Sequence, residues 1–509
     1  MADDNITPGG AEADGRQDDA APDDAFSSRR GKLDQLREQG REPYLSRFDV
    51  THRAAELAES YSYLEPGADT GETVTVAGRL VARREQGKVA FLVIRDSTGD
   101  LQLFCRVNVL GAESFAEATS LDLGDWVGAT GEVLRTRRGE LSVAPTGVTL
   151  LSKSLRPLPE KFHGLTDTET RYRQRYVDLI ANPEVRQVFE TRFRIVSAIR
   201  RFMEGRGFLE VETPMLHPIP GGATARPFVT HHNALDIDLY LRIAPELYLK
   251  RLLVGGFERV YEVNRSFRNE GMSPRHNPEF TMLEAYQAFT DLEGMMELTE
   301  SLITTVADEV LGTLEIEYQG TPVDLTSPWP RRTMIELTSE AAGEDVSFSR
   351  TLAELRGLCS AHGIPADDSW GKGKLITELF EKLVEHTLTG PVFVTEYPLE
   401  TSPLARKKPG EPELTERFEV IVNGREIANA FSELVDPVDQ RERFEAQMRA
   451  KATGDDEAMG YDADYLRAME YGMPPAGGLG IGIDRLVMLL TDSASIRDVL
   501  LFPHMRPEA

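Results

Sequence analysis

The chain has 509 residues, of which 40% are hydrophobic, and a formal net charge of −27 at pH 7. That length is too great for one ordinary domain, so we expect two or three hydrophobic cores. The acidic balance argues against a protein that coats nucleic acid by bulk charge, because sequence-independent phosphate binding needs clustered Lys and Arg. Cys105 and Cys359 lie far apart without a CxxC partner, so nothing supports a disulfide framework or a structural zinc site. We expect a reducing, cytoplasmic location.

The first 72 residues divide into two segments. Residues 1–28 are rich in Asp, Ala, Gly and Pro and lack the apolar region of a signal peptide, which predicts a disordered acidic tail. Residues 29–72 begin with a short predicted helix, RRGKLDQLREQG, that ends at Gly40. No run in the sequence approaches about eighteen consecutive apolar residues, so we expect no membrane span.

Residues 73–150 carry a strand pattern that is interrupted by Gly or Asp. Five strand-like segments in so short a stretch are typical of a small closed barrel of the OB type. Such barrels bind single-stranded nucleic acid by stacking bases on exposed aromatic rings beside basic side chains. Phe91, Phe104 and Trp126 are candidates for this stacking, with several arginines nearby in the sequence. The alternative is that these rings belong to the barrel core.

The remainder of the chain mixes helices and strands. Residues 151–182 contain two prolines and many charges in place of strand alternation, which indicates a linker followed by a helix. Residues 183–509 predict a larger α+β domain, with FLEVETPML as a strand ended by Pro214 and an inserted helical layer around residues 335–395. Nine arginines stand between residues 171 and 206, and on this feature alone we prefer a solvated helix face with ion pairs.

The stretch SFRNEGMSPRHNPEFTMLEAY, residues 266–286, predicts two strands joined by a loop. Because side chains alternate along a strand, Arg268 and Glu270 share one face of the first strand, while Phe280, Glu284 and Tyr286 share one face of the second. Even-to-even pairing would join them into one surface with a guanidinium for an anion, a ring for a base and carboxylates for a cation. A surface hairpin of ion pairs is the alternative, but it leaves Glu284 unexplained among apolar neighbours.

The segment ERFEVIVNGREIANAFSEL predicts a second hairpin, with a two-residue turn at Asn-Gly. Simple pairing places Glu419 opposite Ala428, on the same face as Glu426. Two carboxylates held so close repel unless a cation lies between them, and oxygen ligands suit Mg²⁺ that also contacts phosphates. The same alternation places Asn429, Phe431 and Glu433 on the other face unless the strand bulges after Ala428.

Alternate glycines in GGLGIGIDRLVMLL leave one face of a strand without side chains, at Gly478, Gly480 and Gly482. Two explanations remain open: a flat ligand that lies against this face, or a closely packed neighbouring strand. Arg485 follows at the start of an apolar helix, where it can meet an anion or stack on a ring.

These segments resemble the signature motifs of class II aminoacyl-tRNA synthetases, most closely the bacterial lysine enzymes. GFLEVETPML is similar to motif 1, FRNEGMSPRHNPEFTMLEAY to motif 2 and GLGIGIDRLVMLL to motif 3, while APELYLKRL and FSEL are of the lysine type. The resemblance implies an antiparallel catalytic sheet flanked by helices, preceded by an OB barrel that binds the anticodon. It further implies a homodimer, with Pro214 in its interface, that activates L-lysine with ATP and transfers it to the 3′ end of tRNA(Lys).

The resemblance also implies roles for individual residues. Arg268 and Arg485 would be catalytic. The residues expected to bind ATP are Arg268, Glu270, His276, Phe280 and Arg485. Those expected to bind lysine are Gly222, Glu246, Arg268, Glu284, Tyr286, Asn429, Phe431 and Glu433. Glu419 and Glu426 would hold Mg²⁺, and Phe91, Gln102 and Glu140 would contact the anticodon.

One departure from the resemblance stands in EIANAFSEL, where Ala428 and Ala430 replace the glycines of many bacterial relatives. We expect their methyl groups to tighten the pocket wall slightly. The competing functions are an aspartate or asparagine enzyme, a paralogue that delivers lysine to a protein or lipid, and a catalytically silent nucleic-acid-binding scaffold. The paired acids Glu284 and Glu433 disfavour an aspartate substrate, the barrel disfavours the protein-modifying paralogue, and Arg268 with Glu419 disfavours the scaffold.

Overall fold

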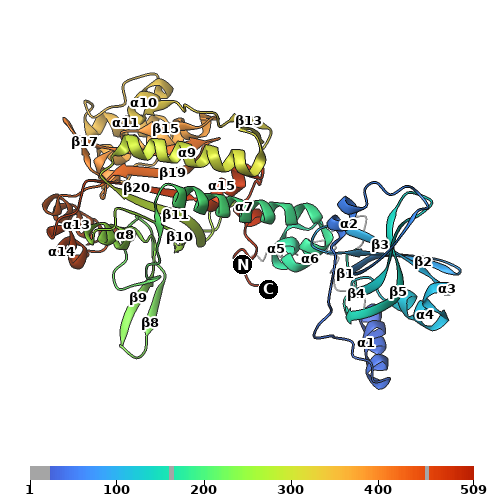
Figure 1. Ribbon diagram of the computed structural model, residues 1–509. Coiled ribbons are helices and arrows are strands. Elements are labelled where there is room, and N and C mark those ends of the chain that lie inside the picture. Colours follow the sequence, from blue (N-terminus) through green and yellow to red (C-terminus); the bar gives the residue numbers. More distant parts are fainter. Residues whose placement is uncertain (1–22, 160–164, 453–457, 509) are drawn as a thin grey trace, which may run out of the picture. The chain divides into compact units, whose positions relative to one another are not determined.

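The computed structural model describes residues 23–159, 165–452 and 458–508. The chain forms two compact units, which divide between residues 164 and 165 (Figure 1). Helix α1 (Asp23–Glu38) begins before residue 29, so residues 23–28 are helical, whereas the rest of the expected acidic tail lies outside the described residues. None of the described helices is long and apolar enough to cross a lipid bilayer.

The first unit is a closed five-stranded barrel, as the strand pattern predicted, with strand order β1-β2-β3-β5-β4. Its strands are β1 (Asp69–Gln86), β2 (Val89–Arg95), β3 (Asp100–Arg106), β4 (Trp126–Arg135) and β5 (Leu141–Ser152). Alternate strand residues such as Leu92, Leu103 and Val127 are fully buried inside the barrel. Helix α2 (Ala54–Ser60) adds Leu57 to this core. Two helices that the strand pattern did not predict, α3 (Val107–Leu110) and α4 (Ala112–Ser120), connect β3 to β4.

The second unit is built on a mixed, mostly antiparallel sheet. In order across the sheet, its described strands are β14 (Arg331–Thr333), β15 (Val392–Thr395), β18 (Arg417–Val422), β19 (Arg425–Ser432), β20 (Ala476–Gly482), β11 (Glu279–Ala288), β10 (Arg259–Phe267) and β6 (Leu209–Glu210). Only the outer pairs β14–β15 and β10–β6 are parallel among these. The predicted α+β class is confirmed, but the strand expected up to Pro214 is shorter, because only β6 pairs with β10 there.

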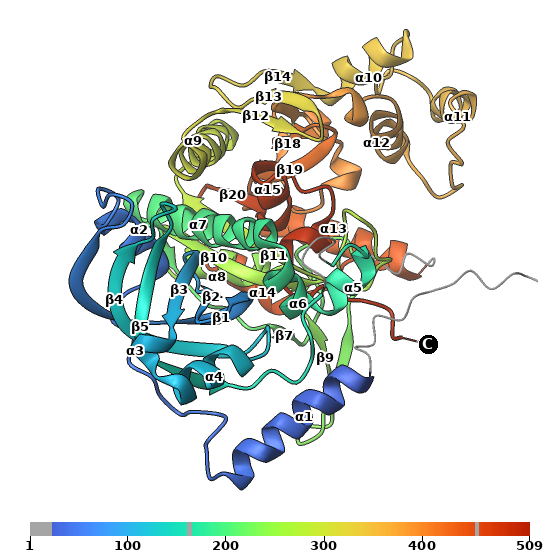
Figure 2. The ribbon, with the colours of Figure 1, turned by 90° about the vertical axis from the view of Figure 1, so that its right-hand side faces the viewer.

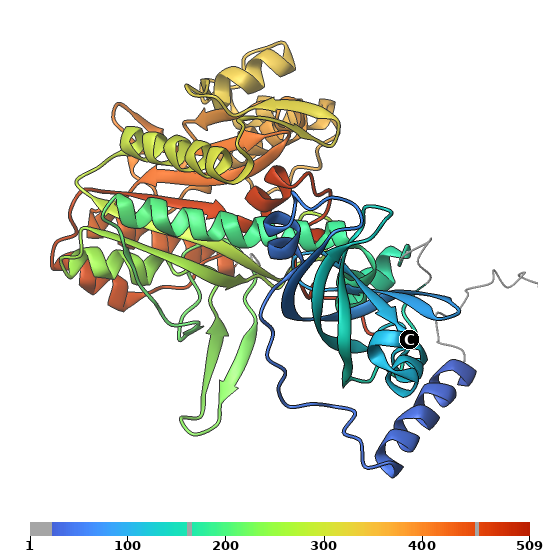
Figure 3. The same cartoon turned by 45° about the vertical axis from the view of Figure 1, so that its right-hand side comes forward.

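Helices α7 (Pro183–Gly205) and α9 (Leu292–Leu311) run side by side across one face of this sheet (Figures 1 and 3). With α15 (Ile483–Leu490) they enclose the largest described core, which contains Ile199, Leu302, Leu283 and Leu479. The opposite face of the central strands is therefore free to carry polar side chains.

The unit begins earlier than expected, at residue 165, because the segment taken for a linker contains α5 (Thr168–Arg173) and α6 (Arg175–Ala181). Two of the nine arginines between residues 171 and 206 form ion pairs that are shielded from solvent, unlike those of a solvated helix face. Arg175 is 1% exposed and contacts Asp178 at 2.5 Å, and Arg192 contacts Asp484 of α15 at 2.6 Å. Other arginines of α7, such as Arg200, do form the expected exposed ion pairs.

The β10–β11 hairpin has the predicted even-to-even register, with Glu262 opposite Glu284 and Ser266 opposite Phe280. The odd-numbered residues Leu283 and Ala285 face the core. Phe280, Glu284 and Tyr286 consequently lie on the other face, which is the face that the hairpin pattern assigned to the site.

The β18–β19 hairpin departs from the predicted register. Pairing near its turn is as expected, but the register then shifts by one residue, so that Glu419 lies opposite Asn429 and not opposite Ala428. The extra residue on β19 is Ile427, and both Ile427 and Ala428 are buried in the core. Such a bulge restores alternation on the far side. It therefore leaves Glu426 and Asn429 on the same face.

Smaller elements surround the sheet. The remaining strands are β7 (Leu216–His217), β8 (Val229–His232) and β9 (Ile237–Leu241) in one small sheet, β12 (Glu315–Tyr318) with β13 (Thr321–Asp324), and β16 (Lys407–Lys408) with β17 (Glu411–Thr415). The remaining helical segments are α8 (Glu246–Val254), α10 (Met334–Ala342), α11 (Leu352–Ala361), α12 (Lys372–Leu383), η1 (Glu385–Thr387), η2 (Leu399–Thr401), α13 (Pro437–Ala452), α14 (Ala463–Glu470) and α16 (Ile496–Val499). Helices α10 to α12 gather around a core of their own beside β14 and β15 (Figure 2).

Candidate active site

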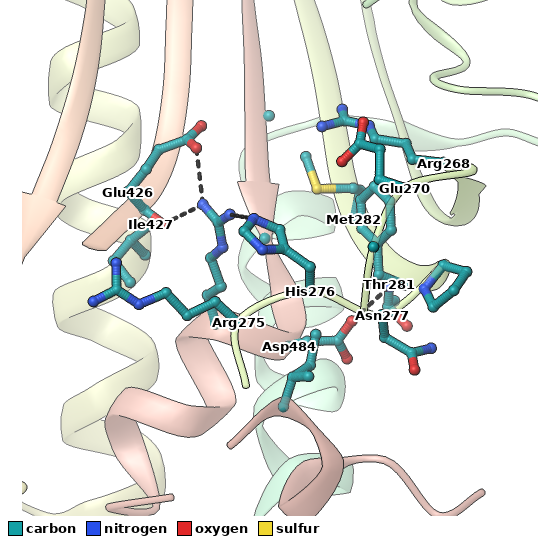
Figure 4. A pocket seen from close by; sticks show the side chains of 17 residues that line it. Arg268, Glu270, Arg275, His276, Asn277, Thr281, Met282, Glu426, Ile427 and Asp484 are labelled. Atoms are coloured by element: carbon teal, nitrogen blue, oxygen red, sulfur yellow. Dashed lines mark hydrogen bonds and ion pairs between the residues drawn. The ribbon is translucent and has the colours of Figure 1, made fainter. Parts of the chain in front are cut away.

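The candidate site occupies the face of the central strands that is turned away from α7 and α9. A cavity of about 130 Å³ opens there, lined by β11, β20, the start of α15 and the loop that follows β10. Arg268 and Glu270 lie on one side of it and Glu426 on the other (Figure 4). Phe280, His276 and Arg485 line the same cavity, so the structure brings together all the residues that were expected to bind ATP.

Arg268 extends the first strand past its end, where its backbone N–H donates to the carbonyl of Pro278 at 2.9 Å. Its guanidinium carbon lies 5.1 Å from the centre of the Phe280 ring. The Nε atom is buried and has no hydrogen-bond partner within the described ranges. Burial lowers the pKa of Arg268, because the charged form is poorly solvated there. A guanidinium held in this way can accept a phosphate or carboxylate as its missing partner.

Arg485 lies at the other side of the cavity and holds Glu426. Its Nη1 donates to the Glu426 carboxylate at 2.8 Å and to the Glu426 carbonyl at 2.9 Å, while Nη2 lies 3.5 Å from His276 Nε2. Burial and the Arg485 charge lower the pKa of His276. Burial alone would raise the pKa of Glu426, but Arg485 lowers it below its ordinary value.

The alternate glycines of β20 lie in two different surroundings. Gly480 and Gly482 line the cavity, so bare backbone there leaves room for a ligand. Gly478 is different, because a Cβ atom would overlap Glu433 Oε1 and lie 2.6 Å from the Tyr286 ring. Close packing of side chains on the neighbouring strands therefore requires glycine at that position.

Arg417, which the sequence analysis did not identify, links the two candidate metal and amino-acid sites. Its Nη2 contacts Glu419 Oε1 at 2.5 Å, and its Nε donates to Asn429 Oδ1 at 3.0 Å. Burial and the nearby Glu426 carboxylate raise the pKa of Glu419 to about 7. The signal that could have identified Arg417 is its position two residues before Glu419, on the same face of a strand.

Glu419 and Glu426 are suitable ligands for Mg²⁺ if a bound polyphosphate supplies the remaining ligands. Each carboxylate repels the other's charge, which a cation between them would relieve. Within the described ranges, no group of three or more His, Cys, Asp or Glu side chains is arranged to hold a metal ion by itself. Mg²⁺ is commonly held by one or two carboxylates together with substrate phosphates, so this donor set is adequate only when a polyphosphate supplies the other ligands.

A second, buried part of the site follows β11 and β20 away from the arginines. It contains Glu246 at the start of α8, Glu284, Tyr286 and Glu433, each at most 6% exposed. Tyr286 donates its hydroxyl to Glu284 Oε2 at 3.2 Å. Gly222 packs against this group, because a Cβ atom there would lie 3.2 Å from Cβ of Glu246.

Lys250 of α8 also belongs to this buried group, although the sequence analysis missed it. Its Nζ contacts Glu246 Oε1 at 2.5 Å, forms an ion pair with Glu433 and lies 5.2 Å from the centre of the Phe431 ring. Burial and the Glu246 carboxylate raise the pKa of Glu284 to about 8. The signal that could have identified Lys250 is its spacing of four residues from Glu246, which places both on one face of a helix.

The bulge at Ile427 decides which side chains of β19 reach the site. Asn429 and Phe431 pair with the site-facing residues Glu419 and Arg417, so they lie on the site face together with Glu426. Ala430 and Ala428 face the core and are almost fully buried there. The expectation that their methyl groups tighten the pocket wall is therefore wrong.

The barrel carries its own candidate surface. Phe91 and Phe104 are paired across β2 and β3 on the outer face, where their rings stack at 5.1 Å, so the barrel-core alternative is wrong for both. Arg84 and Arg106 each lie over one of these rings. Trp126 lies elsewhere, under Arg79, and is 39% exposed.

Gln102 lies on the same outer face as the stacked rings. Its side-chain amide donates to Ser142 Oγ at 2.8 Å, and Ser142 in turn donates to the Glu140 carbonyl. The structure thus brings Gln102 and Glu140 together beside Phe91. This arrangement of rings, arginines and hydrogen-bonding groups suits single-stranded nucleic acid.

Two family models match the chain. One, described as tRNA synthetases class II (D, K and N), matches residues 167–506, and the other, described as an OB-fold nucleic acid binding domain, matches residues 74–151. The chain therefore belongs to the class II tRNA synthetases of the D, K and N group. It is similar to the lysine–tRNA ligase of Carboxydothermus hydrogenoformans, with 57% identity over 94% of this chain and 96% of that protein.

Two further relatives extend this similarity. The lysine–tRNA ligase of Pelotomaculum thermopropionicum is 57% identical over 97% of each chain. That of Moorella thermoacetica is 56% identical over 96% of this chain and 99% of its own length.

Proposed function

We propose that this protein is a lysine–tRNA ligase, which activates L-lysine with ATP and transfers the lysyl group to the 3′ end of tRNA(Lys). The observation that carries this proposal is the buried group of carboxylates, Glu246, Glu284 and Glu433, beside a cavity lined by arginines. Three acids in a dry pocket are costly unless cations accompany them. Lysine supplies such cations at both ends of its side chain, whereas an aspartate side chain would be repelled.

In the activation step, the lysine carboxylate attacks the α-phosphorus of ATP, and the bond to the β-phosphate breaks to release pyrophosphate. Arg268 contacts both the carboxylate and the α-phosphate, so it stabilises the negative charge that develops on the phosphoryl oxygens. Phe280 and Arg485 enclose the adenine ring, Glu270 lies at its edge, and His276 lies near the terminal phosphates. No general base is required, because the attacking carboxylate is already ionised and only has to be positioned.

Glu419 and Glu426 would hold Mg²⁺ together with the phosphates of ATP, and the ion would supply neutralisation of the triphosphate charge. In the structure their carboxylates contact Arg417 and Arg485. Both arginines are thus close enough to follow the phosphates when the carboxylates bind a cation.

At the amino-acid end, Glu246 accepts from the α-amino group of lysine beside Gly222. Glu284, Tyr286 and Glu433 surround the ε-ammonium group, and Asn429 and Phe431 form the walls. In the transfer step, the terminal ribose hydroxyl of tRNA attacks the lysyl carbonyl and AMP leaves.

The barrel serves the anticodon in this proposal, with a base stacked on Phe91 and hydrogen-bonded by Gln102, and with Glu140 nearby. Phe91→Ala should weaken the binding free energy of tRNA by roughly 1 to 3 kcal/mol, which appears as a higher KM for tRNA. It should leave amino-acid activation unchanged, which a comparison of pyrophosphate exchange with aminoacylation measures. Equal KM values for tRNA would remove Phe91 from the anticodon site.

We further propose that the protein acts in the cytoplasm as a homodimer. Support for the dimer comes from exposed apolar side chains around Pro214 and the β8–β9 hairpin, which projects from the sheet (Figure 1). They are Leu209, Met215, Leu216, Val229, Leu235 and Ile237, each at least 42% exposed. Light scattering after size-exclusion chromatography should give twice the chain mass, and Leu216→Asp should lower that value.

The central experiment is amino-acid-dependent exchange of pyrophosphate into ATP, measured with each of the twenty amino acids. Lysine should stimulate exchange far above the others. Absence of a lysine response, or an equal response to aspartate or asparagine, would contradict the proposed function.

A further inference from the structure

Lys250 is the one cation that contacts the described carboxylates of the amino-acid pocket through ion pairs, and no part of its side chain is exposed. Helix α8 is packed on two sides, because Leu247 belongs to one apolar cluster and Leu249 and Leu253 to another. This packing of α8 and the two ion pairs hold the ammonium group in the pocket.

The two carboxylates that Lys250 contacts come from separate elements. Glu246 lies one turn earlier on α8, at 2.5 Å from Nζ, whereas Glu433 follows β19. The proposed function assigns these two acids to opposite ends of the bound lysine. Lys250 thus connects the group that accepts the α-amino nitrogen with a group that accepts the ε-ammonium.

The ion pair leaves part of each acid available. Glu433 contacts Lys250 through Oε2, while its Oε1 faces Tyr286 and Gly478 and has no hydrogen-bond partner within the described ranges. Glu284 is reached by the Tyr286 hydroxyl and not by Lys250. One internal ammonium thus leaves acceptors for a cation that enters the pocket.

The charges of the pocket match those of a substrate with two ammonium groups. When all three acids are ionised, as beside the ammonium groups of a bound substrate, Glu246, Glu284 and Glu433 face a single ammonium of the chain, so two negative charges remain. Lysine carries two ammonium groups, and its carboxylate is directed to Arg268. The pocket and the two substrate ammonium groups are then balanced, which a low-dielectric site requires.

We propose that Lys250 is a specificity-determining positioning residue: it acts as a permanent third ammonium that orients Glu246 and Glu433 and sets the pocket charge to suit a substrate with two ammonium groups. This inference rests on the proposed lysine activation. Burial alone would lower the pKa of Lys250, but the Glu246 and Glu433 carboxylates raise it above its ordinary value, so the group stays charged.

The test is pyrophosphate exchange with full-length Lys250→Met, which keeps an unbranched side chain that is one atom shorter and removes the charge. The KM for lysine should rise about tenfold or more, because two buried carboxylates lose their fixed partner. The KM for ATP should stay within about twofold, because the phosphate end does not contact Lys250. Lys250→Ala should recover part of its lysine activation when propylammonium chloride, which matches the deleted part of the side chain, is added, but not when neutral 1-propanol of the same size is added.

A matched control is Lys153→Met in the barrel, where Lys153 is another buried lysine, at 2.8 Å from Asp125. It should lower thermal stability, as Lys250→Met should too, and leave the KM for lysine unchanged. This control separates the general cost of a lost buried ion pair from an effect on substrate binding.

Three results would overturn the inference: an unchanged or lower KM for lysine in folded Lys250→Met, an equal rise in the KM for lysine and for ATP, or equal rescue by propylammonium and 1-propanol. A lower KM would mean that Lys250 competes with the substrate for its carboxylates. If the parent protein itself gave no lysine-dependent exchange, the proposed function would fail, which is a distinguishable outcome.

Discussion

The phosphate end and the amino-acid end of the site both contain ion pairs, but the pairs differ in their contact with solvent. At the phosphate end, the side chains of Arg485 and Glu426 are 28% and 38% exposed. At the amino-acid end, Lys250 and Glu433 are both 0% exposed. Exposed pairs contribute little to stability and can exchange partners at low cost, whereas a buried charge that loses its partner is strongly destabilised. The Arg485–Glu426 pair can therefore exchange partners when ATP binds, whereas the acids of the amino-acid end require a cation beside them whether or not the substrate is bound.

The largest expected effect is at the phosphate end. Arg268→Ala should lower kcat for lysine-dependent pyrophosphate exchange by about 10² to 10³, because a preorganised group that stabilises the transition state is lost. Arg265→Ala is a matched control, since Arg265 lies three residues earlier in the chain, is 42% exposed in its side chain and forms a long ion pair with Glu279 at 3.6 Å. Similar losses in both variants would show that Arg268 has no special role.

A smaller effect is expected at the amino-acid end from Glu284→Gln. The variant keeps the shape of the side chain and removes a charge-assisted hydrogen bond. The fall in kcat/KM for lysine should correspond to a loss of roughly 1 to 3 kcal/mol in transition-state binding free energy. Glu279→Gln on the same strand, with a 38% exposed side chain, should leave kcat/KM unchanged. Equal catalytic efficiency of Glu284→Gln and the parent would remove Glu284 from the lysine pocket.

The buried end should also respond to pH. The pKa of Glu284 is raised to about 8, first by burial and then by Glu246, with Glu262 raising it further and Tyr286 and Arg268 acting in the opposite direction. Below that pKa the carboxyl is protonated and its attraction for the ε-ammonium is lost. Ionisation of Glu284 should therefore lower the KM for lysine by about fivefold between pH 7 and pH 8. Burial also raises the pKa of Glu433 to about 8, against the attraction of Lys250, so its ionisation adds to this fall.

The KM for ATP over the same pH range is the internal reference and should change less. Steady-state exchange at a series of pH values measures both constants. If Glu284→Gln showed the same dependence of the KM for lysine on pH as the parent, another group would be responsible.

The smallest effect is expected behind the site. Ala428→Gly and Ala430→Gly should each reduce the free energy of unfolding by about 0.5 to 1 kcal/mol, because glycine loses more backbone entropy in a strand. The KM for lysine should not change, because both methyl groups face the core. A changed KM at constant thermal stability would place these residues in the pocket after all.

The sequence predicted those parts of the fold that depend on local alternation. Strand alternation was sufficient for the five barrel strands and for the β10–β11 register, so the common face of Phe280, Glu284 and Tyr286 followed from spacing alone. The helices α3 and α4 were missed, because short helices between strands carry too little periodic signal to separate them from loops.

Contacts between segments that are distant in the chain could not be predicted from local alternation. The bulge at Ile427 places all later residues of β19 on the face opposite to the one that simple alternation predicts. It allows both Ile427 and Ala428 to be buried in the core. Lys250 and Arg417 were missed for a related reason. Each is one of many charged residues in the sequence until the fold places it against a carboxylate.

The sequence by itself determined the two-part organisation, the barrel strands and the motifs that mark a class II synthetase, because each depends on residues that are near neighbours in the chain. Only the tertiary structure decided which face β19 presents, how far each ion pair is buried, and that the amino-acid pocket contains a cation of its own. Burial and charge pairing arise when α8, β11, β19 and β20 meet, and electrostatic energies depend on those distances and on solvent exclusion.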